Sequence, residues 1–398
     1  MKLKKFLKGV AFISIALTLS TNVVLADSST LSESGVKFVD DDSGGGGSGG
    51  GGGSGGGGGE TPEPTDKKYV ILASGEKYTD VLASTVLANE RKCPILLTTK
   101  DSLDEKTLNE IKRLKTEEVI ISGGPDSVSE KIVTQLSGYT TRRVSGANRY
   151  ETAIEVAKEV RGLTNILSGA MLVDGTNFPD VITISGLATQ LRVPILLTSP
   201  QTLTTSTKDK IKEWSINDIT IGGGTNSVSQ QIQDSFTTQK VVRFGGSNRY
   251  ETALSIAQEV RNKAGNSTDM VLVDGTNFPD GLTVSTLAAA FKAPILLTHP
   301  AALHDTTKSK MSVWGMENVL IGGGINSVSK NVVDNLGVKR VERVSGINRY
   351  ETAVKISERL SSKDTPIGRM ATNPAARASS VEKQSIFRTL FNRVFGIQ

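Results

Sequence analysis

The chain alternates short, uninterrupted apolar runs with longer segments in which apolar residues recur at helical spacing. Successive residues of a strand face opposite sides of a sheet, so a run that is apolar throughout indicates a strand buried on both faces. Helix-period segments between such runs are typical of a parallel sheet that is covered on both sides. The pattern therefore predicts an open α/β fold of the flavodoxin-like or Rossmann-like kind.

The central part of the chain shows the pattern most clearly. The predicted strands are 169–173, 194–198, 218–221 and 241–244, and the predicted helices are 178–191, 205–214, 227–236 and 250–260. Residue pairs with the spacing of a capping box precede or open three helices: Asn148 with Glu151, Asn177 with Asp180, and Ser227 with Gln230.

Segments of this unit return at a spacing of 100 residues. Asn-Arg-Tyr-Glu-Thr-Ala begins at Asn148, Asn248 and Asn348. The others are Pro-Ile-Leu-Leu-Thr from 94, 194 and 294, Val-Asp-Gly-Thr-Asn-Phe-Pro-Asp from 173 and 273 with a looser copy at 73–80, and a Gly-Gly turn before Ser-Val-Ser from 123, 223 and 323. A fixed period indicates tandem modules. We therefore expect three modules of one fold, at 67–166, 167–266 and 267–360.

The flanking segments have other compositions. Residues 1–26 combine a Lys-rich start, an apolar run and Val24-Leu25-Ala26, which predicts a secretory signal peptide. Residues 27–66 are acidic and Gly/Ser-rich, which predicts a disordered linker, either a spacer through a wall or an expanded repeat. Residues 361–398 form a basic tail whose apolar residues fall at helical spacing. An amphipathic helix there would cover a module edge or lie on a membrane, and membrane contact is the less favoured alternative.

Net charge limits the kinds of partner that the chain can bind, and cysteine content limits its disulfides. The net charge is +5, but residues 61–363 hold 36 basic and 33 acidic residues, so the modules are close to neutral. Nucleic acid is therefore not expected as a partner, and any anion must bind to local patches. The single cysteine, Cys93, excludes an internal disulfide and is expected to be a small buried apolar residue.

Catalytic signatures are scarce. The two histidines, His299 and His304, both lie in the third repeat, and the sequence holds neither the full dinucleotide-binding fingerprint nor a P-loop. We expect no cofactor, no metal and no catalytic residue. Asp174 and Asp180 recur as Asp274 and Asp280, which is conceivable for glycoside chemistry. Three equal copies of one site suit multivalent binding better than a single reaction centre.

The recurring Arg-Tyr pair has two interpretations. Capping accounts for Asn148 and Glu151 but not for Arg149 and Tyr150. Arg suits bidentate contact with a carboxylate or phosphate, and Tyr suits stacking on a sugar. The alternative is a salt bridge between modules, with Asp174, Asp180 or their equivalents. The Pro-Ile-Leu-Leu-Thr segments are most simply buried strands, whose ends would border a ligand crevice.

Together these motifs resemble the type 2 cell-wall-binding repeat family of Gram-positive bacteria, especially clostridia. The resemblance covers about 68–360 and rests on all the recurring segments. It implies three Rossmann-like modules packed as a pseudo-threefold unit, an intramolecular pseudo-trimer, that binds an anionic secondary cell-wall polymer or a peptidoglycan-linked glycan. Carried over by motif, the candidate polymer-binding residues are Arg149, Tyr150, Arg249, Tyr250, Arg349, Tyr350, Pro94, Ile95, Leu96, Leu97, Pro194, Ile195, Leu196, Leu197, Pro294, Ile295, Leu296 and Leu297.

The resemblance implies a secreted, non-catalytic protein of the cell wall or cell surface. The alternatives are a cell-wall hydrolase, since family members often carry the name N-acetylmuramoyl-L-alanine amidase, and a structural surface-layer component. The chain departs from the family pattern by opening at 69–74 without the Asn-Arg-Tyr-Glu-Thr segment and closing with an extra one at 348. Either the last helix completes the first module, or the chain is part of a longer array.

Overall fold

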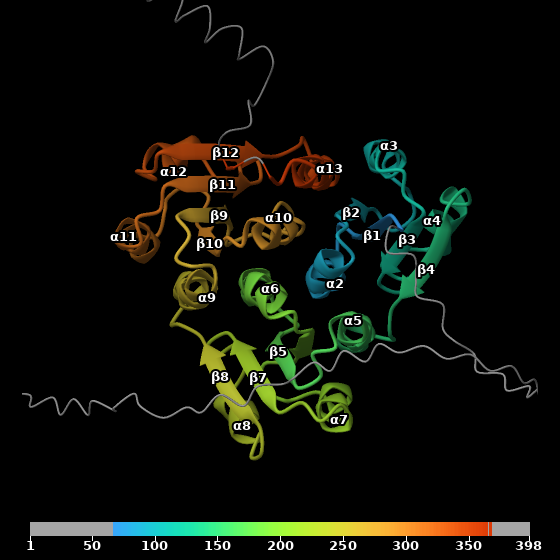
Figure 1. Cartoon of the computed structure of the whole chain (residues 1–398), viewed down its shortest axis with the longest axis horizontal. Helices are drawn as coiled ribbons and strands as arrows, with labels where there is room; N and C mark the ends of the chain where they lie inside the picture. The colour runs from blue at the N-terminus through green and yellow to red at the C-terminus, as the bar shows by residue number, and fades with distance from the viewer. Residues whose placement is uncertain (1–66, 365, 368–398) are drawn as a thin grey trace, which may run out of the picture. The chain divides into compact units, whose positions relative to one another are not determined.

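All the predicted strands and helices of the central module are present in the computed structural model, which describes residues 67–364, 366 and 367 (Figure 1). Their ends lie within three residues of the predicted ones. The predicted signal peptide at 1–26, the linker at 27–66 and, from residue 368, the predicted tail lie outside the described residues. None of the helices within the described part is both long and apolar enough to cross a membrane.

Three sheets of four strands form the framework. The first contains β1 (Tyr69–Ser74), β2 (Ile95–Thr98), β3 (Glu118–Ser122) and β4 (Thr140–Val144). The second contains β5 (Gly169–Asp174), β6 (Ile195–Thr198), β7 (Asp218–Gly222) and β8 (Lys240–Phe244). The third contains β9 (Asp269–Asp274), β10 (Ile295–Thr298), β11 (Asn318–Gly322) and β12 (Arg340–Val344).

Helices connect the strands within each sheet. In the first module they are α1 (Tyr78–Ala83), α2 (Thr85–Glu90), α3 (Glu105–Arg113) and α4 (Glu130–Gln135). In the second they are α6 (Pro179–Leu191), α7 (Thr205–Glu213) and α8 (Gln230–Asp234), and in the third α10 (Val284–Phe291), α11 (Asp305–Val313) and α12 (Lys330–Asp334). The Asn-Arg-Tyr-Glu-Thr motifs open α5 (Arg149–Thr164), α9 (Arg249–Lys263) and α13 (Arg349–Leu360).

The three sheets share one topology. All pairings are parallel, and the strand orders are β2-β1-β3-β4, β6-β5-β7-β8 and β10-β9-β11-β12. The connection after the first strand leads to one side of the sheet and the later strands lie on the other, as in flavodoxin-like folds. The predicted fold class is therefore confirmed. The order also places a topological switch point between the first and third strands of each sheet.

Each sheet buries two different cores, which explains why the strands are apolar throughout. On β1, Ile71 and Ala73 face a core shared by all three modules, whereas Val70 and Leu72 face a core private to the first module. The second and third modules have private cores of the same kind. Successive residues of a strand point to opposite faces, so neither face can carry polar residues without a loss of buried apolar area.

The shared core forms where α2, α6 and α10 meet. Each of these helices contacts the other two, which is the set of contacts that a pseudo-threefold arrangement requires. Small hydroxyl residues lie at equivalent, fully buried positions of the three helices: Thr85, Ser185 and Ser285. The hydroxyls of Thr85 and Ser285 are 3.0 Å apart and hydrogen bonded. Ser185 donates to the carbonyl of Ile182 at 2.7 Å, so these buried hydroxyl groups are satisfied.

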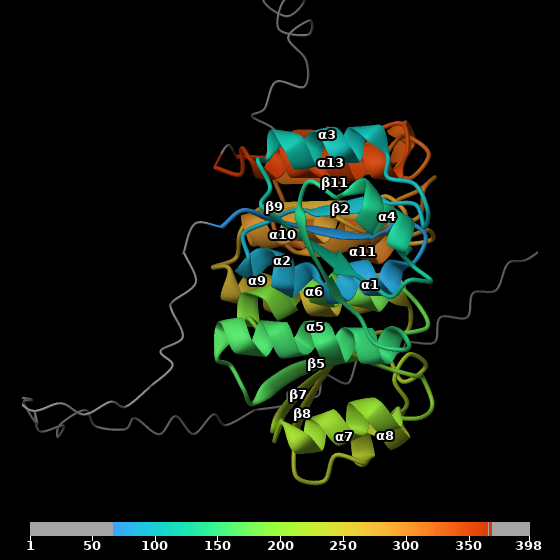
Figure 2. The ribbon, with the colours of Figure 1, turned by 90° about the vertical axis from the view of Figure 1, so that its right-hand side faces the viewer.

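Two of the motif helices pack on the sheet that follows them in sequence, and the third packs on the first sheet. Helix α5 contacts β6 of the second sheet and α9 contacts β10 of the third. The last, α13, contacts β2 and α3 of the first, and Figure 2 shows α3 and α13 side by side. Ser357 donates to Glu110 at 2.6 Å and Arg113 donates to Ser361 at 3.2 Å across this contact. The last helix thus completes the first module, one of the two alternatives that the sequence left open.

The module boundaries at 67–166, 167–266 and 267–360 remain a prediction made from the sequence period. The packing describes each module differently, as a sheet together with the motif helix that covers it. In these terms the first module joins two distant parts of the chain, because its covering helix comes from 349–360.

Substituting Ile356 with Ala should expose Cys93, which directly precedes the β2 segment that α13 covers. Ile356 is fully buried in the shared core, so the cavity should cost about 2–5 kcal/mol of stability. Burial raises the pKa of the Cys93 thiol to about 12, so its slow reaction with a thiol reagent reports local opening. Ile256→Ala is the matched control, because it removes the same atoms from α9, which packs on β10. Equal Cys93 reaction rates in the two variants would contradict the assignment of α13 to the first sheet.

Candidate functional site

The Asn-Arg-Tyr-Glu-Thr motif begins each of the three covering helices with an Asn cap, in which Asn148 and Asn248 accept two N–H bonds and Asn348 accepts one. The Asn148 side chain accepts from the backbone N–H groups of Tyr150 and Glu151 at 3.0 and 3.1 Å. The Glu151 carboxylate accepts from the N–H of Ala147 at 3.0 Å, one residue before the N-cap. Glu351 and Glu251 make the same contact with the residue before their N-cap. The predicted capping of this helix by Asn148 and Glu151 is therefore confirmed.

The other two predicted capping boxes are wrong. Helix α6 begins at Pro179, which has no backbone N–H group for a cap to bind. The side chain of Asn177 accepts only from the N–H of its neighbour Phe178. Helix α8 is capped by Ser229, whose hydroxyl accepts from the N–H of Ile232 at 3.3 Å. Ser227 instead lies beside the buried Asp180 in the lining of one cavity. Spacing alone does not show which of two nearby Ser residues lies at the helix start.

The motif arginines link neighbouring sheets. Arg149 Nη1 donates to the carbonyl of Gly175, in the loop after β5 of the next sheet, at 2.7 Å. Arg249 makes this bond to Gly275 and Arg349 to Gly75, in the loop after β1. The predicted alternative of a contact between modules is thus observed, but the acceptor is a backbone carbonyl and not the carboxylate of Asp174 or Asp180.

The motif tyrosines pack on the same glycines. A Cβ atom at Gly175 would lie 3.0 Å from the ring of Tyr150, and one at Gly75 would lie 2.7 Å from the ring of Tyr350. The three tyrosines are partly buried against the shared core, and Tyr250 also stacks on His304 with ring centroids 4.7 Å apart. A side chain in these loops would crowd the neighbouring module's tyrosine, which favours glycine there.

The Pro-Ile-Leu-Leu segments lie elsewhere. They form the edge strands β2, β6 and β10, on which the covering helices pack. Their Ile and Leu side chains are at most 2% exposed: Ile95, Leu96, Leu97, Ile195, Leu196, Leu197, Ile295, Leu296 and Leu297. Pro194 and Pro294 are buried as well, and Pro94 is half-buried. Polymer contact by these segments stays a prediction.

Three aromatic rings that the sequence reading did not single out meet beside the arginines. Tyr78, Phe178 and Phe278 have ring centroids 5.5–6.2 Å apart, in tilted and edge-on pairs. The Arg249 guanidinium lies 5.8 Å from the centre of the Phe178 ring, and Arg349 lies 5.8 Å from that of Phe278. We call these three rings the aromatic triad. An aromatic residue at the same place in each repeated loop was the signal that could have found it.

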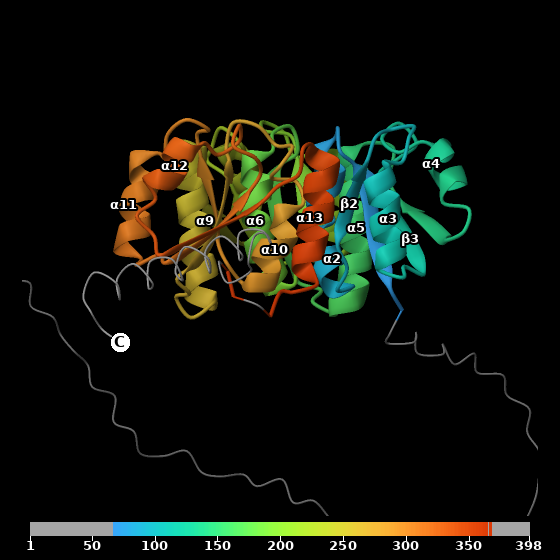
Figure 3. The same cartoon turned by 90° about the horizontal axis from the view of Figure 1, so that it is seen from above.

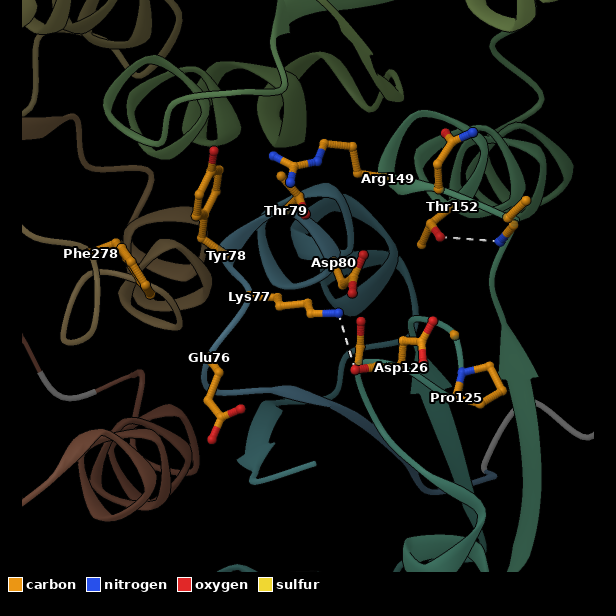
Figure 4. Close-up of a pocket in the computed structure, with 15 residues that line it drawn as sticks. Glu76, Lys77, Tyr78, Thr79, Asp80, Pro125, Asp126, Arg149, Thr152 and Phe278 are labelled. Atoms are coloured by element: carbon orange, nitrogen blue, oxygen red, sulfur yellow. Dashed lines mark hydrogen bonds between the residues drawn. The ribbon is translucent and has the colours of Figure 1, made fainter. Parts of the chain in front are cut away.

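Cavities open at the carboxyl ends of the strands, beside these residues. The first, of about 500 Å³, lies at the switch point of the first sheet, between the loop after β1 and the Gly-Gly turn after β3 (Figure 4). Its lining includes Lys77, Asp80, Asp126, Arg149 and Phe278. An equivalent cavity of about 220 Å³, lined by Asp180 and Arg249 among others, lies in the second sheet. Ligands of open α/β sheets bind at such points.

A buried carboxyl group stands at the back of each of these two cavities. Burial raises the pKa of Asp80 and of Asp180, more than the hydrogen bonds from Ser127 and Ser227 lower it. A Cβ atom at Gly123 would lie 2.6 Å from the Asp80 carboxylate, and this glycine has φ of +109°. The first glycine of the Gly-Gly turn therefore supplies both the backbone conformation and the space that the carboxyl group needs.

A second set of recurring arginines, which the sequence pattern did not single out, holds the Gly-Gly turn in place. Arg143 donates to the carbonyl of Gly123 at 2.8 Å, and Arg243 and Arg343 donate to those of Gly223 and Gly323 at 2.9 and 2.7 Å. Their positions, 100 residues apart, carried the same periodic signal as the named motifs. Burial lowers the pKa of Arg243 and Arg343, which is consistent with a structural role away from bulk solvent.

The groups that recur in the three modules can contact a ligand. Within the described residues no three His, Cys, Asp or Glu side chains are placed to hold a metal ion. His304 stacks on Tyr250 and contacts the hydroxyl of Thr306, and both partners lie outside the first two cavities. What recurs is a guanidinium, an aromatic ring and a switch-point loop, which together can contact anions and sugar rings.

Comparison with known proteins agrees with the repeat pattern. The sequence profile of the family named Cell wall binding domain 2 matches residues 44–133, 143–233 and 243–333, so the resemblance noted from the sequence is confirmed. The second and third matches begin just before a motif helix, in the phase that the packing shows.

Relatives and solved structures of the same kind are longer. The N-acetylmuramoyl-L-alanine amidase LytC of Bacillus subtilis (strain 168) is 32% identical over 269 residues, 67% of this chain and 52% of the relative. The amidase enhancer of the same organism is 29% identical over 274 residues, 67% of this chain and 36% of the relative. The chain thus spans about half or less of the curated relatives it matches.

Two solved proteins of Clostridium difficile share the fold. Cwp6 has a TM-score of 0.58 at 25% identity, covering 73% of this chain and 44% of Cwp6. Cwp8 has a TM-score of 0.54 at 26% identity, covering 75% of this chain and 48% of Cwp8. The three-sheet arrangement is therefore shared with longer proteins of known structure.

Substituting Gly123 with Ala should destabilise the fold by about 1–3 kcal/mol, because the new methyl group meets the Asp80 carboxylate and the backbone has positive φ. Gly124→Ala is the control, since the nearest atom to its Cβ is the carbonyl oxygen of Gly146 at 3.9 Å. Urea unfolding of both variants measures the difference. If the two variants were equally stable, the turn would not depend on the carboxyl group behind it.

Stability should depend on pH through Asp80 and Asp180. Burial raises the pKa of both carboxyl groups in the folded protein above 3.8, so their protonated forms favour folding. This stability is fully present below pH 3.8 and is lost as the pH rises through the raised pKa values. We expect the unfolding free energy of D80N/D180N, minus that of the wild type, to rise with pH over this window. Urea titrations at several pH values measure it, and a difference that falls with pH would contradict the burial effect.

Proposed function

We propose a function on the premise that the chain belongs to the Cell wall binding domain 2 family: it is a wall-binding protein without catalysis of its own, which holds an anionic secondary polymer of the wall. Family membership supports binding to the cell wall and association with the cell surface. The identity of the polymer, secretion of the chain and a pseudo-trimer that acts as one binding unit belong to the proposal.

The three motif arginines carry the proposal. They lie around the aromatic triad. The loops and helix starts that carry them follow the carboxyl ends of the strands, at the end of the modules that is uppermost in Figure 3. Each guanidinium has five N–H donors, and the bond to a glycine carbonyl fixes it in place while the outer donors remain for a phosphate or carboxylate. A repeating polymer would meet three such groups in one encounter, so that weak single contacts add up to firm retention.

The remaining candidates follow from this geometry. The motif tyrosines pack beside the arginines and would rest against the sugar part of the polymer. The Pro-Ile-Leu-Leu segments enter the proposal through the family resemblance, and the burial of their side chains makes the arginines the residues to test first.

A hydrolase is the second candidate, because one relative is an N-acetylmuramoyl-L-alanine amidase. That relative is about twice as long as the part of it that this chain matches, so the amidase name does not transfer to the matched repeats. Release of peptide from purified peptidoglycan by the intact chain would favour this alternative.

Replacing Arg149, Arg249 and Arg349 together by Ala should abolish co-sedimentation with purified Gram-positive walls. Acid removal of the secondary polymer from the walls should abolish binding of the wild type. Arg→Lys at the three positions should retain part of the binding, because it keeps the charge but loses the bidentate geometry. Thermal unfolding of each variant checks that loss of binding is not loss of fold.

The matched control carries the same loss of charge at the other end of the modules. Lys92, Arg192 and Lys292 are exposed, lie at equivalent positions just before β2, β6 and β10, and can be changed together to Gln. This control should bind walls as the wild type does. Equal binding of the wild type to intact and stripped walls would instead identify peptidoglycan as the target and overturn the anionic-polymer proposal.

A further inference from the structure

The three modules repeat in sequence, but their switch-point cavities are not equal. The first measures about 500 Å³ and the second about 220 Å³. Pockets that bind small molecules usually measure about 300–1,000 Å³, so the first lies within this range and the second below it. In the lining of the first cavity Thr79 stands where the second has Pro179, and Lys77 stands where it has Asn177.

The wall of the first cavity carries charges of both signs. Lys77 and Arg149 oppose Glu76, Asp80 and Asp126, so net attraction for an anion is not its distinguishing property. Lys77, Asp80 and Asp126 gather at the centre of the cavity (Figure 4), where the Lys77 ammonium donates to the Asp126 carbonyl at 3.1 Å. Closely spaced donors and acceptors of this kind match the hydroxyl groups of a sugar ring.

Two aromatic rings and a buried carboxyl group form the rest of the wall of the first cavity. Tyr78 and Phe278 of the aromatic triad line the cavity on one side and offer an apolar surface to the face of a ring. On the other side Asp80 is only 5% exposed, and Ser127 lines the cavity with it. An acceptor held this firmly needs no reordering when a hydroxyl group approaches, which favours tight and specific contact.

The corresponding carboxyl group of the third module, that of Asp280, already accepts hydrogen bonds from the protein. Both Asp280 oxygens accept hydroxyl groups of the protein, from Ser327 at 2.5 Å and from Thr352 at 3.3 Å. Thr152 of the first module and Thr352 both accept from a backbone N–H, that of Gly146 at 3.1 Å and that of Gly346 at 3.0 Å. Only Thr352 also donates to the buried carboxyl group, whereas the Thr152 side chain lines the first cavity. The repeats thus differ in what they leave available to a ligand.

We infer that the first switch-point cavity is the principal sugar-binding site of the chain, taking one sugar ring of the polymer while Arg149 at its edge contacts the adjoining acidic group. This rests on the proposed function, and adds to it that the three repeats bind unequally. The ring hydroxyls pair with Asp80, Lys77 and Asp126, and the ring face rests on Tyr78 and Phe278.

Paired substitutions test the inequality. Asp80→Asn should weaken binding of the intact chain to polymer-bearing walls by roughly tenfold, the loss expected when a hydrogen bond to a charged group is removed. Asp180→Asn changes the same kind of buried carboxyl group in the smaller cavity and should change binding less than twofold. Lys77→Gln should weaken binding as well, whereas Lys112→Gln, an exposed lysine on α3, should not. Equal effects of D80N and D180N at equal thermal stability would overturn the inference.

Hydrogen exchange locates the contact independently of the variants. Addition of the polymer released from walls by mild acid should slow exchange at 76–80 and 124–127 more than at 176–180 and 224–227. Equal protection of the two sets would refute a principal site in the first module.

The outcome for this site is separable from that for the proposed function. If the triple arginine variant loses wall binding while D80N and K77Q keep it, the proposed function is supported and the principal sugar site in the first cavity is refuted. If the wild type does not bind walls at all, the proposed function and the sugar site are both refuted.

Discussion

The structure depends on burying both faces of each small sheet. A four-stranded sheet of this size can cover one face with its own short helices, α3 and α4 in the first module, but the other face needs apolar surface from elsewhere. In the first module the surface comes from α6 and α10 of the other modules, which meet the module's own α2 in the shared core, and from the covering helix α13. A single module would expose a row of buried Ile, Leu and Val side chains, and each costs about 1.5–3 kcal/mol when moved into water.

The same packing creates the candidate site. Since all strands in a sheet are parallel, the loops that follow them gather at one end, and the shared core brings the three sets of loops together. The motif arginine of one module then reaches the glycine carbonyl of the next, and the aromatic triad forms from one ring of each module. The proposed binding residues therefore also hold the modules together, and a variant at these positions needs a separate measurement of stability.

The direction of the chain gives the modules two distinct ends. The described chain enters at the amino end of β1, and α13 runs back to that end after starting beside the site (Figure 3). The arginines, the aromatic triad and both switch-point cavities lie at the opposite end. Polymer bound there would meet loops of the modules and not the first or last described residues.

The sequence by itself determined the local structure and the repeat. Apolar runs predicted the strands, helical spacing predicted the helices to within three residues, and the 100-residue period predicted three modules, because these properties depend on near neighbours along the chain. It also indicated Arg149 and Tyr150, since capping accounts for Asn148 and Glu151 alone. Only the tertiary structure decided that α13 completes the first sheet, that the arginines bond to carbonyls of the next module, and that Tyr78, Phe178 and Phe278 touch. These are contacts between residues 26 to about 270 positions apart. They arise because apolar faces of helices and sheets pack against each other, and no short stretch of sequence encodes that packing.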